Sequence, residues 1–159
     1  RLVCDSLRTI LGNQENVYVV GCATNADELH FLLPHANLVL LGADFEKQNT
    51  TELLDEIRLT NPNSHFLIMG VDENPEIIIR YIEAGAAGYI LQNESVEEMI
   101  LKLQAANEEK ALISPSIAAA MMDRLAHLAN LETPLAMMES RETYREELTT
   151  REVEVLKVI

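Results

Sequence analysis

Short apolar runs alternate with amphipathic stretches along most of the chain. Each run is a few residues long and ends at a glycine or a polar residue, the pattern of a strand buried on both faces. The predicted strands cover residues 17–22, 38–41, 66–69 and 88–91. Between and around them, apolar residues at helical spacing predict helices over residues 1–11, 25–33, 51–60, 75–84 and 95–106. This alternation favours an α/β fold with a parallel sheet and helices on both of its faces.

Local signals mark where several of these helices begin and end. Asn25 and Asn74 stand at N-cap positions, where a side-chain oxygen can accept from a free backbone N–H. Ser95 and Glu98 have the spacing of a capping box. Gly85 stands where a left-handed C-terminal cap belongs. The helix boundaries are therefore predicted from local chemistry as well as from periodicity.

The same periodicity predicts which helix residues face the core. The inward stripes are Val3, Leu7, Ile10 and Leu11 on the first helix, and Val96, Ile100 and Leu103 on the helix at 95–106. Leu2 and Leu101 lie off these stripes. We therefore expect both leucines to be exposed.

The pattern also divides the chain. It opens with a helix where a domain of this kind ordinarily opens with a strand, so we expect a segment upstream of Arg1. Residues 1–106 form the predicted α/β domain. Residues 107–146 are interpreted as a helical linker, including a helix from Ser116 to about Ala129, and residues 147–159 as the start of a second domain.

Charge and composition limit the partners and the chemistry. Twenty-six acidic against twelve basic residues give a net charge of -14, which is a poor match for the phosphate backbone of nucleic acid. Any contact with DNA must then come from a locally basic piece or from sequence beyond this chain. No apolar run approaches the length that spans a membrane, so a cytoplasmic protein is expected.

The cysteines and histidines do not suggest a cofactor. Cys4 and Cys22 lie in apolar settings without paired spacing, so we predict small core residues rather than a disulfide or a zinc site. The four histidines lie in different predicted elements and have no ligand spacing. We therefore predict no metal and no cofactor.

Four motifs then resemble the receiver domain of NarL/FixJ-type bacterial response regulators, which carry a LuxR-type helix-turn-helix domain. They are Leu-Val-Leu-Leu at 38–41, Glu-Ala-Gly-Ala-Ala-Gly-Tyr-Ile-Leu at 83–91, Ala-Leu-Ile-Ser-Pro at 111–115 and Glu-Leu-Thr-Thr-Arg-Glu-Val-Glu-Val-Leu at 147–156. The resemblance implies a flavodoxin-like (CheY-like) doubly wound sheet over residues 1–106. It also implies that residues 147–159 open a LuxR-type DNA-binding domain.

The resemblance further implies a phosphorylation site that this chain has lost. The position of the acceptor aspartate is Gly42, that of the hydroxyl residue is Gly70, and that of the lysine is Gln92. The family's metal-binding acidic pair would lie upstream of Arg1. Asp44 is the nearest carboxylate to the acceptor position but lies two residues further along a loop, and phosphoryl transfer depends on tight positioning.

Two other features each allow two interpretations. Tyr89 occupies the position of the family's switch aromatic and is either such a switch or a half-buried strand tyrosine. The family often dimerises through its first and fifth helices, so Leu2 and Leu101 are a candidate dimer face, although single exposed leucines are also common on monomers.

Three functions compete. The first is a transcriptional regulator that acts independently of phosphorylation, by dimerisation or by binding a ligand or protein, and controls an attached DNA-binding domain. The second is a protein-interaction module without DNA contact, which the absence of a basic recognition helix downstream of Ile159 would favour. The third is an enzyme on a flavodoxin-like fold, which the missing nucleophile makes the weakest, so we predict no enzymatic activity.

Overall fold

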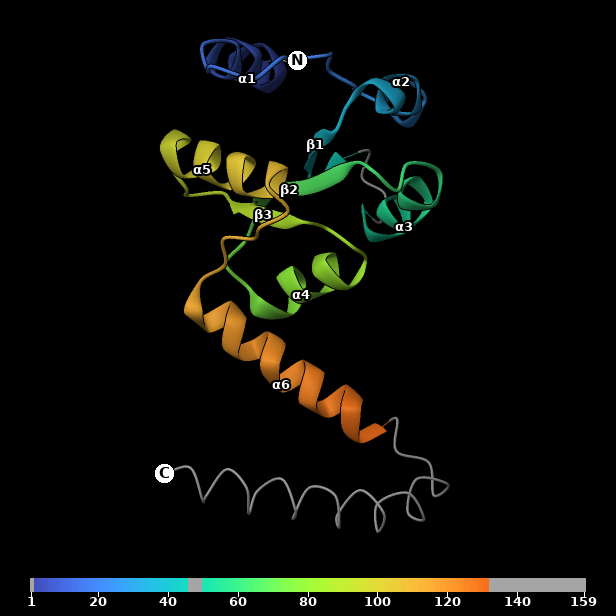
Figure 1. Ribbon diagram of the computed structural model, residues 1–159, viewed down its shortest axis with the longest axis vertical. Helices are drawn as coiled ribbons and strands as arrows, with labels where there is room; N and C mark the ends of the chain where they lie inside the picture. Colours follow the sequence, from blue (N-terminus) through green and yellow to red (C-terminus); the bar gives the residue numbers. More distant parts are fainter. Residues whose placement is uncertain (1, 46–49, 132–159) are drawn as a thin grey trace, which may run out of the picture. The chain divides into compact units, whose positions relative to one another are not determined.

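The computed structural model describes residues 2–45 and 50–131 (Figure 1). Its helices are α1 (Leu2–Gly12), α2 (Ala26–Leu32), the 3-10 turn η1 (Leu33–His35), α3 (Thr50–Thr60), α4 (Pro75–Glu83), α5 (Val96–Asn107) and α6 (Pro115–Leu131). Its strands are β1 (Leu38–Gly42), β2 (His65–Val71) and β3 (Gly88–Leu91). The chain divides into two compact units, Arg1–Ala118 and Ala119–Ile159. None of the described helices is long and apolar enough to cross a membrane.

The three strands form one parallel sheet in the order β1-β2-β3. Each crosses to the next through a helix, because parallel neighbours cannot be joined by a tight turn. α5 packs against all three strands, and α4 packs against β2. Figure 1 shows these two helices on opposite sides of the sheet. The first unit is therefore the α/β domain with a parallel sheet that the alternating pattern predicts.

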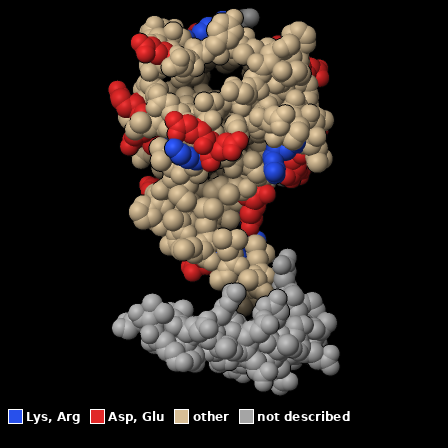
Figure 2. All heavy atoms as spheres, viewed as in Figure 1, with Lys and Arg blue, Asp and Glu red and all other residues tan. Residues whose placement is uncertain are grey.

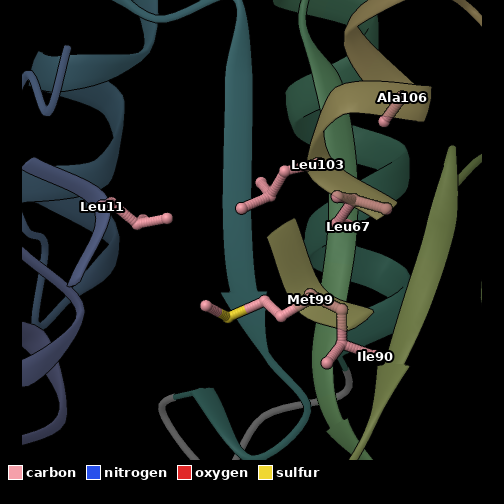
Figure 3. Close-up of a cluster of buried hydrophobic side chains, with 6 residues drawn as sticks. All are labelled: Leu11, Leu67, Ile90, Met99, Leu103 and Ala106. Atoms are coloured by element: carbon pink, nitrogen blue, oxygen red, sulfur yellow. The ribbon is translucent and has the colours of Figure 1, made fainter. Parts of the chain in front are cut away.

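A buried hydrophobic cluster joins α1, the sheet and α5 (Figure 3). Its members are Leu11, Leu67, Ile90, Met99, Leu103 and Ala106. Val17 and Val19 pack against its margin from the segment that follows α1. The cluster holds helix α1 and helix α5 on the same part of the sheet, which matters below for the two exposed leucines.

Several predicted helix signals are confirmed. The side chain of Asn25 accepts from the backbone of Glu28 at 2.9 Å, and Asn74 caps α4 in the same way. Ser95 and Glu98 form both hydrogen bonds of the capping box at the start of α5. Gly85 follows α4 with a φ of +96°, the left-handed conformation expected of a C-terminal glycine.

The predicted strand at 17–22 is wrong. These residues alternate between partly buried and exposed, as a strand would, but they pair with no described strand. A strand exists only where a neighbour satisfies its backbone groups. The sequence pattern therefore predicted the alternating exposure of this segment correctly, but not a place in the described sheet.

Some predicted inward positions are also wrong. Val3 and Val96 are 61% and 40% exposed, and the buried face of α5 runs through Met99, Leu103 and Ala106. Leu38, predicted with its strand to be buried on both faces, is only partly buried, and Leu41 is the one residue of β1 that is fully buried. The error on α5 is one of phase, because apolar residues occur on more than one side of that helix.

The prediction for the cysteines is wrong as well. Cys4 of α1 and Cys22 are joined in a disulfide, with their Cα atoms 6.2 Å apart. Cys22 is exposed and Cys4 only partly buried, so neither is a core residue. The 18-residue separation concealed a contact that depends on how α1 folds back on the following segment.

The interpretation of residues 132–146 as linker and of 147–159 as the start of a DNA-binding domain lies outside the described residues.

Candidate functional site

The carboxyl ends of the three strands lie at one edge of the sheet, because the strands are parallel. Gly42 ends β1 and pairs with Met69, the residue before Gly70. The backbone N–H of Gln92 donates to the carbonyl of Val71 at 3.1 Å. The structure therefore brings the three positions of the predicted degenerate site to the same edge.

A side-chain hydrogen bond links two of the three. Nε2 of Gln92 donates to the backbone carbonyl of Gly70 at 3.2 Å. The resemblance expects a lysine at position 92, whose charge would contact a phosphoryl group. Here a neutral amide is directed to the sheet's own backbone instead. No sequence signal marked this bond, because it depends on the register of β2 against β3.

Gly70 is an extra residue in β2. Met69 pairs with Ile90 and Val71 with Leu91, so Gly70 forms a bulge between them. Its φ of +79° lies in the left-handed region that glycine adopts without steric cost. A threonine or serine with this backbone would be strained. The local geometry of β2 is therefore adapted to the absence of a side chain at this position.

Gly42 differs, because it has room for a side chain. A Cβ atom added there would meet nothing within 4 Å, and the backbone has no positive φ. An aspartate at position 42 would therefore fit the fold, and steric exclusion does not explain the glycine. Because Gly42 contributes only main-chain atoms, this position cannot supply the carboxylate that a Mg²⁺ site of the family's kind would need there.

Asp44 is exposed and its charge acts on α4. Burial raises the pKa of Tyr81, and the negative charge of Asp44 raises it further. The carboxylate of Asp44 is thus close enough to the phenol of Tyr81 to oppose its ionisation.

Over residues 2–45 and 50–131, no group of three or more His, Cys, Asp or Glu side chains is placed to hold a metal ion.

Lys102 of α5 makes buried polar contacts that the sequence did not predict. Its Nζ donates to the backbone carbonyl of Tyr89 at 2.8 Å and forms an ion pair with Oε1 of Glu94 at 2.5 Å. Both side chains are largely buried, at 11% and 13% exposure. The amine is therefore committed to this pair, because withdrawing one partner would leave a poorly solvated charge.

Tyr89 lies inside the domain and connects it to the following segment. It is 2% exposed, more buried than expected, and pairs with Ile68 in the middle of the sheet. Its hydroxyl oxygen accepts from the backbone N–H of Ser114 at 3.3 Å, and Nζ of Lys102 lies 4.2 Å from the ring centroid. The position of the switch aromatic is thus occupied by a tyrosine with contacts on both its ring and its hydroxyl.

Leu2 and Leu101 are both exposed, at 85% and 56%. They lie on α1 and α5, which both contribute to the buried cluster, α1 with Leu11 and α5 with Met99 and Leu103 (Figure 3). The two leucines therefore belong to neighbouring helices of one unit, on surfaces that the cluster does not use.

Comparison with known proteins identifies regulators of transcription. The chain is 26% identical over 159 residues to the uncharacterized transcriptional regulatory protein YxjL of Bacillus subtilis (strain 168), covering 98% of this chain and 69% of that protein. It is also 26% identical to the nitrate/nitrite response regulator protein NarL of Escherichia coli (strain K12), covering 96% and 68%. No protein-family model matches the chain.

Solved structures agree on the fold. A LuxR-family two-component response regulator from Aurantimonas sp. SI85-9A1 has a TM-score of 0.67 at 20% identity, covering 79% of this chain and 91% of that one. The isolated REC domain of RcsB from Salmonella enterica serovar Typhimurium, with the phosphomimetic BeF3-, has a TM-score of 0.64 at 19% identity, covering 75% and 90%. The described α/β unit therefore has a CheY-like receiver fold, and it corresponds to the receiver part of these regulators.

Proposed function

We propose that this chain is the receiver part of a transcriptional regulator that acts without phosphorylation of its receiver. Its relatives, which are response regulators of the NarL/LuxR type, support this proposal. The observation that carries the proposal is the edge of the sheet at Gly42, Gly70 and Gln92. There the amide of Gln92 bonds to the backbone of Gly70, and Gly42 offers no carboxylate. Because a regulator of transcription must reach DNA, the proposal includes a cytoplasmic location.

The chemistry of phosphoryl transfer supports this proposal. An acyl phosphate needs a carboxylate nucleophile, and its charge needs a cation or several donors to hold it. Gly42 supplies no nucleophile, and the amine of Lys102 is paired with Glu94 and bonded to the carbonyl of Tyr89. Restoring one of these groups would leave the others missing.

The proposed output is assembly of two copies, which would position an attached DNA-binding domain. Leu2 and Leu101 are the proposed contact, on the neighbouring helices α1 and α5. Structures of the related RcsB from Salmonella enterica serovar Typhimurium bound to promoters support DNA as the final target. Figure 2 shows acidic side chains spread over the visible face of the described part, and the chain carries a net charge of -14, so DNA contact is assigned to other sequence.

The test is exposure of the chain to a small phosphodonor such as acetyl phosphate with Mg²⁺, followed by intact-mass measurement. We expect an unchanged mass, because Gly42 has no carboxylate and Gln92 has no charge with which to hold a phosphate. A stable phosphate adduct on Asp44 would contradict the proposal.

The matched variant is Gly42→Asp, which the open space at Gly42 accommodates. We expect its oligomeric state to stay the same with and without the phosphodonor, because Gly70 and Gln92 still cannot respond to a phosphate. A phosphate-dependent change of oligomeric state in this variant would show that one carboxylate is enough, and that the other two positions had been wrongly dismissed.

A further inference from the structure

A backbone hydrogen bond joins the start of helix α6 to strand β3. The backbone N–H of Ser114 donates to the hydroxyl oxygen of Tyr89 at 3.3 Å. Ser114 is the residue just before α6, and its side-chain oxygen accepts from the backbone N–H of Ile117 at 3.4 Å. Ser114 therefore occupies the N-cap position of α6. One residue thus caps this helix with its side chain and bonds to the sheet with its backbone.

The first turn of α6 is part of the α/β unit. Ile117, in that turn, is 1% exposed, and the boundary between the two compact units lies after Ala118. Pro115 is the first residue of the helix, where its missing N–H leaves no donor to satisfy. The bond to Tyr89 and the burial of Ile117 therefore both lie within the first unit.

The segment between α5 and Ser114 is also fixed at its other end. The backbone N–H of Lys110 donates to the carbonyl of Ala105 at 2.8 Å, the long bond of a Schellman motif at the end of α5. Glu109, before it, has a φ of +57°, a conformation that is costly for a residue with a side chain. Such a backbone persists where the contacts around it enforce it. The segment therefore leaves α5 along one defined path and arrives at Ser114 in contact with the sheet.

Tyr89 is held in place through both its backbone and its ring. It is 2% exposed and pairs with Ile68 in the sheet. Nζ of Lys102 donates to its carbonyl at 2.8 Å and lies 4.2 Å from its ring centroid. The ion pair with Glu94 fixes the amine of Lys102 in turn. The hydroxyl that meets Ser114 therefore has a defined position.

These contacts oppose the movement that a switch aromatic requires. Rotation of the Tyr89 side chain would break its bond to Ser114 and withdraw its ring from Lys102. Gly70, at the position of the family's hydroxyl residue, has no side chain that could bond to a phosphoryl group and favour the rotated state. The contacts thus favour a tyrosine that stays where it is.

We infer that Tyr89 is a positioning residue: its hydroxyl anchors the N-cap of α6 and so fixes where the chain leaves the α/β unit. The regulatory meaning of this anchor rests on the proposed function, because a receiver that acts without phosphorylation has no use for a moving aromatic. The output segment is then held in one constant arrangement at its start. The anchor itself is a local property, which can be measured whether or not the receiver responds to phosphate.

Amide hydrogen exchange of the full chain, followed residue by residue by NMR, tests the anchor. Tyr89→Phe removes the hydroxyl and keeps the ring in the core. The Ser114 amide should then exchange roughly three- to tenfold faster, as expected for the loss of one neutral hydrogen bond. The Met99 amide in α5 should exchange as in the wild-type chain. An unchanged Ser114 amide, or equal acceleration at Ser114 and Met99, would overturn the inference.

Two control variants separate the anchor from the cap and from the loss of a hydroxyl elsewhere. Ser114→Ala removes the cap of Ile117 but keeps the backbone N–H that meets Tyr89. It should speed exchange at Ile117 more than at residue 114, the reverse of the order in Tyr89→Phe. Tyr81→Phe removes a phenol hydroxyl of α4 on which the charge of Asp44 acts, and it should change neither amide. The same order of effects in Ser114→Ala and Tyr89→Phe would refute a separate role for the tyrosine hydroxyl.

Beryllofluoride and Mg²⁺ test directly whether the tyrosine moves. Exchange of the Ser114 amide in the wild-type chain should be the same with and without this phosphate mimic. A change with the mimic would overturn the inference and would also contradict the proposed function. If the wild-type chain ignores the mimic but Tyr89→Phe leaves Ser114 unchanged, the anchor fails and the proposed function stands, so the two failures are distinguishable.

Discussion

Gly85 shows how one residue can be required by two elements. It follows α4 with a φ of +96°, and its N–H donates to the carbonyl of Ile82 at 2.9 Å. The side chain of Arg58 lies where a Cβ would be, and its Nη1 donates to the carbonyl of Ala84 at 3.2 Å. A side chain at position 85 would meet both a strained backbone and the guanidinium of α3.

Gly85→Ala should therefore lower the free energy of unfolding by about 1–3 kcal/mol, the cost of a left-handed non-glycine residue and of a displaced arginine. Chemical denaturation measures this difference. Gly12→Ala is the control, because Gly12 has no positive φ and nothing within 4 Å of an added Cβ. A loss of stability in both variants, or in neither, would contradict this account of Gly85.

At the scale of elements, α5 depends on its first turn. Ser95 accepts from the backbone N–H of Glu98, while the Glu98 carboxylate accepts from both the backbone N–H and the hydroxyl of Ser95. These bonds satisfy backbone groups that the helix cannot pair internally. The same helix contributes Met99, Leu103 and Ala106 to the core, so its start positions a large part of the cluster.

The capping box should make α5 sensitive to acid. The backbone N–H of Ser95, and next its hydroxyl, hold the pKa of Glu98 below its ordinary value of 4.5. A carboxyl with a lowered folded pKa contributes stability that is present above its unfolded pKa and lost as pH falls through the folded one. We therefore expect the first turn of α5 to fray as pH drops below about 4.5.

NMR titration of the Glu98 carboxyl, together with amide exchange in the first turn of α5, checks this expectation. Glu98→Gln is the control, because glutamine keeps a capping side chain but does not titrate. Its first turn should lose the acid dependence that belongs to residue 98. Ser95→Ala should cost about 1 kcal/mol of stability at neutral pH and raise the pKa of Glu98 only part of the way to its ordinary value, because alanine keeps the backbone N–H. An unshifted Glu98 titration in the wild-type chain would contradict the role of the box.

At the scale of the whole molecule, the proposed function requires constitutive assembly. Sedimentation equilibrium should show a dimer both with and without beryllofluoride and Mg²⁺, because under the proposal Gly42, Gly70 and Gln92 do not bind a phosphate mimic. Leu101→Glu should weaken the dimer by about tenfold or more, since it places a charge in an apolar contact. The net charge of -14 would add to the repulsion between two copies.

Leu59→Glu is the matched control, because Leu59 is 86% exposed on α3 and adding glutamate there changes the net charge equally. It should leave the dimer intact. A monomer that dimerises only with the mimic would show that a phosphate site survives. Equal weakening by both variants would mean that net charge, rather than the face at Leu2 and Leu101, controls assembly.

The amino-acid sequence by itself determined the features that depend on neighbours along the chain. Apart from residues 17–22, the order of the described helices and strands followed from periodicity. The caps at Asn25, Asn74 and Ser95 and the left-handed Gly85 followed from turn chemistry, since each of these is settled within about four residues. The absence of a carboxylate at Gly42 was also readable directly, because no folding can supply a side chain that is absent.

Tertiary structure alone decided the features that depend on distant partners. Residues 17–22 had the pattern of a strand but no described strand to pair with. No signal in the sequence marks Lys102 as buried, but in the structure its side chain is largely buried in an ion pair with Glu94. The sequence spacing of Cys4 and Cys22 did not indicate a disulfide, because the bond depends on how α1 lies against the segment that contains Cys22. Periodicity and propensity describe local conformation, whereas strand pairing, buried ion pairs and disulfides depend on which segments meet, and only the folded chain decides that.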